Sequence, residues 1–344
     1  KGRNLVICID GTSNQCGLTN TNVIELYGQI LREESYEQLT YYNSGIGTYA
    51  APSWKSWSYL MRVIHNKIDL AIAWDLEKVI LGAYQWLSNQ YRTGDKIFLF
   101  GFSRGAFQVR ALAGMIETVG LILPGNEAQI PLYHYANYDA AGKDQAIAPM
   151  FKKMFSRPDV RVHFVGVWDT VSSVGLMRPK NMLPRIVGCC NHVCHFRHAL
   201  ALDERRVKFL PEYVHEGKSH KRDEKLFPGE GCTAKIKEVW FAGTHSDVYV
   251  YPLLLLFSPR SITAGLLFKG VDVNLMKWTL IDFEQDVMPS LGGMWNVLEQ
   301  FPVRRLSYKG RHSTSRRPHR GKSRKIVEGQ MIHASVISRP GYKP

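Results

Sequence analysis

The hydrophobic pattern of the first two thirds of the chain alternates between strand-like and helix-like segments. Short apolar runs predict buried strands over residues 4–9, 39–43, 97–102, 162–168 and 236–241. Between these runs, apolar residues at helical spacing predict helices over residues 23–31, 75–91 and 106–116. Strands that alternate with helices favour a mainly parallel sheet covered by helices, an α/β architecture.

Two stretches lack this alternation. Residues 121–157 and 175–232 are mixed and polar, and we interpret them as helical insertions that form a cap over the sheet. The 344 residues are 45% hydrophobic and 22% charged, which suffices for a substantial core. We therefore expect a single domain over residues 1–344.

The segment GFSRG, residues 101–105, has the pattern of a nucleophile elbow. This pentapeptide is weak evidence alone, but here a predicted strand precedes it and a predicted helix follows it, as the elbow requires. Glycines avoid side-chain clashes in the strained turn, and the helix aims N–H groups at a developing oxyanion. The pattern predicts that Ser103 is a nucleophile; the alternative is a small residue in a tight connection.

A serine nucleophile needs a base, and the base needs an orienting acid. Asp169 follows the strand predicted over 162–168, and His245 follows the strand predicted over 236–241. The chain order Ser, Asp, His is that of α/β-hydrolases, and the carboxyl ends of parallel strands meet at one edge of a sheet. Alternatively, Asp169 caps a helix and His245 is an ordinary loop residue; His333 is a rival base.

The sequence Asp10-Gly11-Thr12 at the end of the first strand admits two interpretations. Aspartyl phosphatases carry Asp-x-Asp-Gly-Thr there, but Cys8 occupies the position of their attacking aspartate. The hydrolase interpretation fits better, because a loop after an early strand supplies one oxyanion donor and the residue after the serine supplies the other. We therefore expect backbone N–H donors from Gly11 or Thr12 and from Arg104.

The six cysteines do not form a disulfide pattern, and no N-glycosylation sequon occurs. The cluster Cys189-Cys190-x-His192-x-Cys194-His195 is a weak zinc candidate, because its cysteines are adjacent and no second ligand pair accompanies it. We expect no metal and no cofactor. The cysteine usage predicts a reducing, cytoplasmic setting. A peripheral location on a membrane is compatible with that setting.

Positive charge is concentrated near the C-terminal end of the sequence. The net charge is +14, and the stretch Arg304–Lys325 contains ten Lys or Arg residues and no acid. We expect residues 300–325 to be a basic surface segment, and contact of Arg304–Lys325 with an anionic membrane is a hypothesis that these charges suggest. Nucleic acid is a less favoured partner, because no reader motif or interleaved aromatic residue accompanies the charges. The plainest alternative is a solvated loop.

Seven ordered blocks resemble one known family. They are RNLVICIDGTSNQ, TNVIELY, YYNSGIGT, FLFGFSRGAFQVRALAGMI, FVGVWDTVSSVG, FRHALALDERRVKF and EVWFAGTHSDV, and a late block, RRPHRGKSRKIVEGQMIHASV, is also similar. The family is the α/β-hydrolase family of unknown function that includes the type VI secretion phospholipase effectors. The resemblance implies an α/β-hydrolase fold with a Ser-Asp-His triad and, in some relatives, hydrolysis of phospholipid acyl esters.

The chain departs from this family's pattern after His245. Where the family has a run of glycines, the sequence continues Val248-Tyr249-Val250-Tyr251-Pro252. Glycines next to the histidine would permit a tight turn that β-branched and aromatic residues resist. The sequence thus predicts a serine esterase or lipase that cleaves lipid acyl esters through an acyl-serine intermediate. A catalytically inactive binding protein on the same fold is the alternative.

Overall fold

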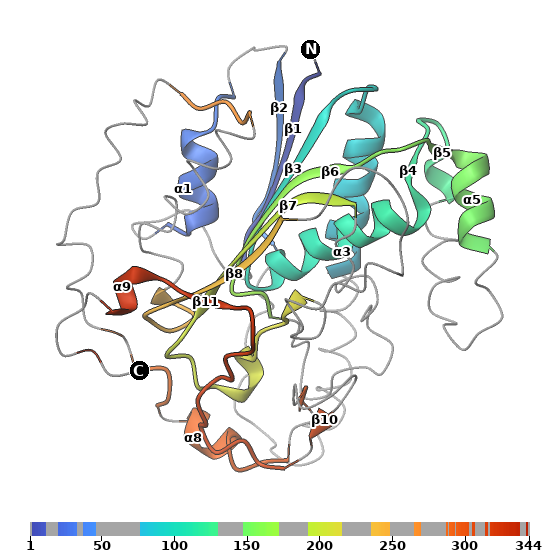
Figure 1. Cartoon of the computed structure of the whole chain (residues 1–344). Helices are drawn as coiled ribbons and strands as arrows, with labels where there is room; N and C mark the ends of the chain where they lie inside the picture. The colour runs from blue at the N-terminus through green and yellow to red at the C-terminus, as the bar shows by residue number, and fades with distance from the viewer. Residues whose placement is uncertain are drawn as a thin grey trace, which may run out of the picture.

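Seven parallel strands form the centre of the molecule in the computed structural model (Figure 1). Their order across the sheet is β11-β8-β7-β6-β3-β1-β2. The structure describes residues 2–11, 20–32, 37–45, 76–129, 147–171, 192–214, 235–247, 265–269, 287, 289–292, 294–302, 305–306, 314–315, 317–337 and 342.

The strands of this sheet are β1 (Asn4–Ile9), β2 (Gln38–Asn43), β3 (Lys96–Phe102), β6 (Val162–Trp168), β7 (Val193–Ala201), β8 (Lys235–Phe241) and β11 (Met331–Ile332). The helices are α1 (Asn22–Gln29), residues 76–90, α3 (Arg104–Val119), α5 (Ile147–Phe155), α8 (Met294–Leu298) and α9 (Ala334–Ile337). Shorter elements are the antiparallel pairs β4 (Leu121–Ile122) with β5 (Ser156–Arg157) and β9 (Arg305–Leu306) with β10 (Thr314–Ser315), and the 3₁₀ turns η1 (Glu127–Gln129) and η2 (Val207–Phe209).

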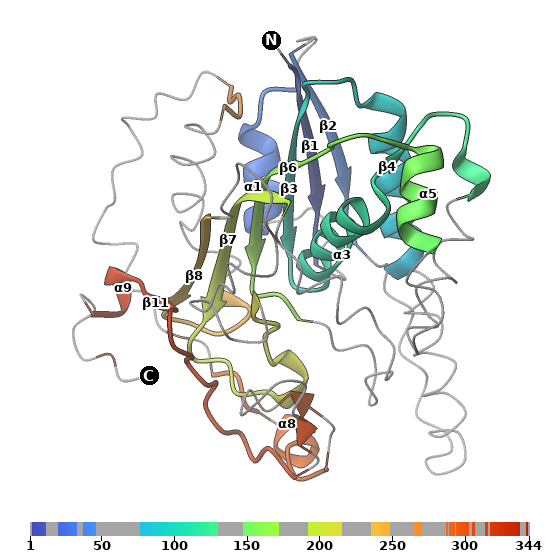
Figure 2. The same ribbon diagram turned by 45° about the vertical axis from the view of Figure 1, so that its right-hand side comes forward.

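Alternating side chains of the buried strands build a hydrophobic core on each face of the sheet. Leu5 and Ile7 of β1 lie in the core that α3 and the helix over residues 76–90 cover. Val6 and Cys8 point to the opposite face, in the core that α1 covers. Helices on both faces explain why these strands are apolar throughout rather than alternating. The helices on the two faces of the sheet are visible in Figures 1 and 2.

The predicted fold class is confirmed: a seven-stranded parallel sheet is flanked by helices, as in α/β-hydrolases. Part of the predicted cap is wrong, because residues 193–201, inside the stretch 175–232, form strand β7 in the middle of the sheet. This strand carries buried polar side chains, including Arg197 and His198, which disguise it in the sequence. Within 121–157, the described residues form α5, which packs beside α3, and the short β4–β5 pair.

All strands of the parallel sheet end at the same edge, where open α/β sheets place their sites. Strand β3 ends immediately before Ser103 and β6 immediately before Asp169, and β8 ends at Phe241, shortly before His245. In Figures 1 and 2 the arrowheads point toward the end of the molecule that carries α8. No helix within the described part of the chain is long and apolar enough to cross a membrane.

Candidate active site

Ser103 lies in a strained turn between β3 and α3. Its φ of 57° falls in the left-handed region that side chains other than glycine rarely adopt. The neighbouring glycines are required sterically: a Cβ on Gly105 would lie 2.3 Å from the carbonyl oxygen of Ile9, and one on Gly101 would lie 2.6 Å from that of Gly105. The Ser103 N–H donates to the Trp168 carbonyl at 2.9 Å, which ties the elbow to the end of β6.

His245 lies between Ser103 and Asp169. Its Nε2 is 2.9 Å from Ser103 Oγ, and its Nδ1 is 2.5 Å from Asp169 Oδ2. All three residues are buried. The rings of Phe102 and Phe209 lie against the imidazole, with centroids 4.9 and 4.8 Å away. The structure therefore brings the three predicted side chains into a hydroxyl–imidazole–carboxylate chain shielded by aromatic rings.

The Asp169 carboxylate is fully buried and has four hydrogen-bond donors around it. Besides His245, these are the N–H of Ala201 at 3.2 Å from Oδ1 and the guanidinium of Arg324, at 2.6 Å from Oδ1 and 2.9 Å from Oδ2. Burial alone would raise the pKa of the Asp169 carboxyl, but Arg324 and His245 together outweigh it and hold the pKa well below its usual range. Asp169 is therefore ionised and can orient the imidazole.

The turn that carries His245 is fixed by two carboxylates that no motif in the sequence marks as functional. Glu204 accepts the His245 N–H at 3.2 Å, and Asp247 accepts the Thr244 N–H at 2.8 Å. Gly243 precedes the turn with a φ of 115°, which favours glycine. The glycine-poor stretch from Val248 onward lies outside the described residues.

The predicted oxyanion donors fare differently. The sequence predicts an N–H donor from Gly11 or Thr12, but the Gly11 N–H donates to the buried carboxylate of Asp10, at 2.6 Å from Oδ1. Asp10 also accepts from the Thr21 hydroxyl at 2.5 Å, and Thr21 caps α1. Thr12 lies outside the described residues. Arg104 is the first residue of α3, so its N–H has no acceptor within the helix.

The rival base His333 has another environment. Its ring stacks on Phe241, with centroids 4.5 Å apart, while the hydrogen bond to Ser103 Oγ comes from His245. Among the residues that the structure describes, no three His, Cys, Asp or Glu side chains are grouped so that they could hold a metal ion. Cys189 and Cys190, from the weak zinc candidate, lie outside that part of the chain.

A second buried carboxylate–histidine pair lies beside the first. His198 Nδ1 is 2.9 Å from Glu238 Oε1, and His198 Nε2 accepts the N–H of Thr170 at 3.1 Å. Because Nε2 accepts, Nδ1 carries the proton and donates a hydrogen bond to Glu238. Burial lowers the pKa of His198 despite the nearby Glu238 carboxylate. This neutral histidine supports the residue that follows Asp169.

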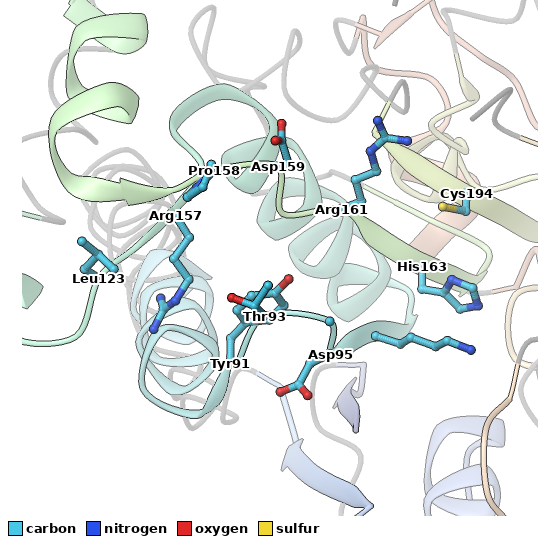
Figure 3. A pocket seen from close by; sticks show the side chains of 12 residues that line it. Tyr91, Thr93, Asp95, Leu123, Arg157, Pro158, Asp159, Arg161, His163 and Cys194 are labelled. Atoms are coloured by element: carbon cyan, nitrogen blue, oxygen red, sulfur yellow. The ribbon is translucent and has the colours of Figure 1, made fainter. Parts of the chain in front are cut away.

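A pocket of about 600 Å³ opens at the other edge of the sheet (Figure 3). Its lining includes Lys96 at the start of β3, Arg161 and His163 at the start of β6, and Cys194 at the start of β7. A seven-residue strand spans roughly 20 Å, so this pocket lies a strand's length from Ser103. It is not part of the candidate active site.

Comparison with known proteins now adds to this geometry. Residues 3–250 match the family described as the catalytic domain of Tle1-like phospholipase effectors of the type VI secretion system (T6SS). The chain belongs to this family. It is also 38% identical over 223 residues to the uncharacterized protein YEL023C of Saccharomyces cerevisiae, which covers 60% of this chain and 32% of the yeast protein.

Two solved structures are similar at lower levels. One is an uncharacterized protein from Pseudomonas aeruginosa, with 18% identity and a TM-score of 0.41 over 78% of this chain and 47% of that chain. The other is the Tle1 effector bound to the VgrG spike, with 17% identity and a TM-score of 0.37 over 72% and 51% of the two chains. The chain thus spans about a third of the yeast relative and about half of each solved chain.

Proposed function

We propose that this chain is a serine hydrolase that cleaves carboxylic esters of lipids, with Ser103 as nucleophile, His245 as general base and acid, and Asp169 as the residue that orients the imidazole. The observation that carries the proposal is the continuous chain of hydrogen bonds from Ser103 Oγ through both nitrogens of His245 to Asp169. A serine hydroxyl on a strained elbow, in contact with an oriented imidazole, is the arrangement that activates serine for acyl transfer.

The reaction proceeds in two halves. His245 Nε2 takes the hydroxyl proton as Ser103 Oγ attacks the ester carbonyl, and the resulting oxyanion accepts hydrogen bonds from backbone N–H groups that include Arg104. The imidazolium then gives its proton to the leaving alcohol, and an acyl-serine remains. Water, deprotonated by His245, attacks this ester, and the proton returns to Ser103 as the fatty acid leaves. No cofactor is needed.

The family supports a lipid substrate, because its members are described as phospholipase effectors. The ring of Phe209 lies against the imidazole and that of Trp295 lies 5.6 Å beyond it, and these aromatic rings suit an acyl chain. Beyond them, α8 and the loop after it expose Val297 and Phe301, which are 59% and 53% exposed. Exposed apolar groups near a site for acyl esters suit a substrate presented in a membrane.

The basic segment supplies cations that suit anionic headgroups. Of the residues described between 317 and 325, Arg317, Arg320, Lys322 and Lys325 are exposed. Substituting Lys322 and Lys325 by Glu should weaken binding to vesicles that contain phosphatidylserine, because each near-surface cation contributes about 1 kcal/mol of attraction. Sedimentation with vesicles at low and high salt measures this. Binding that is independent of salt and of both substitutions would contradict the membrane contact.

The proposed reaction is tested by hydrolysis of soluble p-nitrophenyl esters of increasing acyl length and of a mixed-chain phosphatidylcholine. The wild type should release product from both classes, and Ser103→Ala should release none above background, because the nucleophile is gone. Thermal melting of both proteins controls for folding. If the folded wild type hydrolyses no ester and reacts with no serine-directed probe, the inactive, ligand-binding alternative is correct.

A further inference from the structure

One cation of the basic segment differs from its neighbours. Lys322 and Lys325 are exposed, whereas the side chain of Arg324 is 0% exposed. Arginine is almost never buried completely unless it is paired, because removing its charge from water costs several kcal/mol. The prediction that residues 300–325 form a surface segment is therefore wrong for Arg324.

The partner of Arg324 is the carboxylate that orients His245. Nη1 donates to Asp169 Oδ1 at 2.6 Å and Nη2 donates to Oδ2 at 2.9 Å, a two-pronged pairing that fixes the plane of the carboxylate. Nη1 also donates to the carbonyl of Ala201 at 2.8 Å, and Nη2 donates to the carbonyl of Phe209. These two carbonyls come from the end of β7 and from the turn whose ring lies against His245.

The geometry of Asp169 shows what this pairing does. Oδ2 must point at His245 Nδ1 if the imidazole is to present Nε2 to Ser103. A carboxylate can rotate about its terminal torsion, which is broad and only weakly restricted. The Ala201 N–H holds Oδ1 and the guanidinium holds both oxygens, so these hydrogen bonds prevent the carboxylate from rotating.

We propose that Arg324 is a positioning residue for the hydrolytic triad, supplied by the C-terminal segment. It holds Asp169 ionised in a dry site and aims Oδ2 at His245, so that the base takes up the Ser103 proton. This inference rests on the proposed function, and it makes the docking of residues 317–330 a condition for activity. Tyr213, whose hydroxyl donates to the Lys325 carbonyl at 2.7 Å, holds the same segment in place.

The guanidinium also has an electrostatic effect on the reaction. It lies across Asp169 from His245, so its positive charge opposes the positive charge that the imidazole gains during attack. Among the residues that the structure describes, the other charged or titratable groups around this pair are Glu204, which accepts the His245 N–H and pairs with Arg206, and the buried Tyr213 and His198. Removing the Arg324 charge should therefore favour the imidazolium and move the acid limb of the pH–activity profile to higher pH.

Arg324→Met and Arg161→Met test this assignment as a matched pair. Arg161 is an exposed arginine at the start of β6, the strand that carries Asp169 at its other end. On a soluble ester, Arg324→Met should lower kcat by about 10²-fold with KM within about threefold, as expected when a catalytic group is misplaced by an ångström. Arg161→Met should leave both constants unchanged. Arg324→Lys keeps the charge without the fork and should recover part of kcat and the wild-type acid limb.

A second readout does not depend on turnover. The proton between His245 Nδ1 and Asp169 should give a far-downfield proton resonance in wild type and in Arg161→Met, and this resonance should be lost or broadened in Arg324→Met. A folded Arg324→Met that keeps this resonance, the wild-type kcat and the wild-type pH profile would overturn the assignment. A wild type without any activity but with the Arg324-dependent resonance would refute the proposed function and leave the positioning role supported.

Discussion

Two buried carboxylate–histidine pairs stand side by side at the carboxyl edge of the sheet, and they differ in what the second ring nitrogen meets. In the pair Asp169–His245, Nε2 lies 2.9 Å from the hydroxyl of Ser103. In the pair Glu238–His198, Nε2 accepts a backbone N–H, that of Thr170. A hydroxyl can give up its proton to the ring during a reaction, whereas a peptide N–H cannot.

The carboxylates differ in their other partners as well. Asp169 is paired with the cation Arg324, whereas Glu238 accepts from the neutral amide of Gln330 at 3.0 Å and from the Val214 N–H at 3.1 Å. Arg324 and Gln330 both come from the same C-terminal segment. A buried histidine–carboxylate contact therefore does not identify a catalytic base; the group at the far ring nitrogen does.

The sharpest way to separate the pairs is to replace each histidine in turn. His245→Gln should lower kcat/KM for a soluble ester by on the order of 10⁴-fold, because the base is lost. His198→Gln should lower it by less than about tenfold, while the lost network of buried hydrogen bonds costs about 1–3 kcal/mol of stability. Steady-state kinetics and urea unfolding measure the two effects. Equal losses of activity in both variants would break the distinction.

The two carboxylates should differ in how much free energy of unfolding is lost when each is replaced by its amide. Asp169→Asn removes the charge that balances Arg324 and leaves a buried guanidinium without its hydrogen-bonded counter-ion, which should cost about 3–5 kcal/mol of folding free energy besides most of the activity. The partner Gln330 of Glu238 is neutral, and Glu238→Gln removes only the electrostatic attraction between Glu238 and the buried Arg110, so its cost should be smaller. Denaturant unfolding of both variants ranks them. A larger loss in Glu238→Gln would contradict the role assigned to Arg324.

The smallest expected effect is on the pH dependence of stability. Burial lowers the pKa of His198, so between its folded value and the unfolded value of about 6.5 the unfolded chain binds a proton that the folded chain does not. Stability should therefore fall as the pH drops below about 6.5, by up to about 1.4 kcal/mol per pH unit for this group. His198→Gln should reduce this slope without abolishing it, because burial also lowers the pKa of His319 and His333. Unfolding midpoints between pH 7 and pH 5 give the slopes, and an unchanged slope would mean that His198 is charged in the folded state.

Much of the fold is predictable from the sequence, because strands such as β1 and β6 are continuous apolar runs that end at polar residues. The same pattern predicts that Ser103, Asp169 and His245 meet, since each follows a strand of one parallel sheet. Strand β7 escapes prediction because its polar side chains have partners on the neighbouring strand β8: Arg197 donates to the carbonyl of Lys235, and His198 pairs with Glu238.

Arg324 escapes prediction for a related reason. In the sequence it is one of ten cations, and nothing local distinguishes it from Lys322 or Lys325. Its partner Asp169 lies 155 residues earlier, so only the folded chain reveals the pair. Net charge describes the surface of such a segment well, but it does not identify Arg324 as a residue whose side chain turns inward.

The central claim is that Ser103 is activated by His245 and not by its neighbour His198. A fluorophosphonate probe forms a covalent adduct only with an activated serine, so peptide mass spectrometry of the labelled protein tests it most directly. The adduct is expected on the peptide that contains Ser103 in the wild type and in His198→Gln, and in neither Ser103→Ala nor His245→Gln. A folded wild type that forms no adduct, or an adduct that persists in Ser103→Ala, would contradict the account.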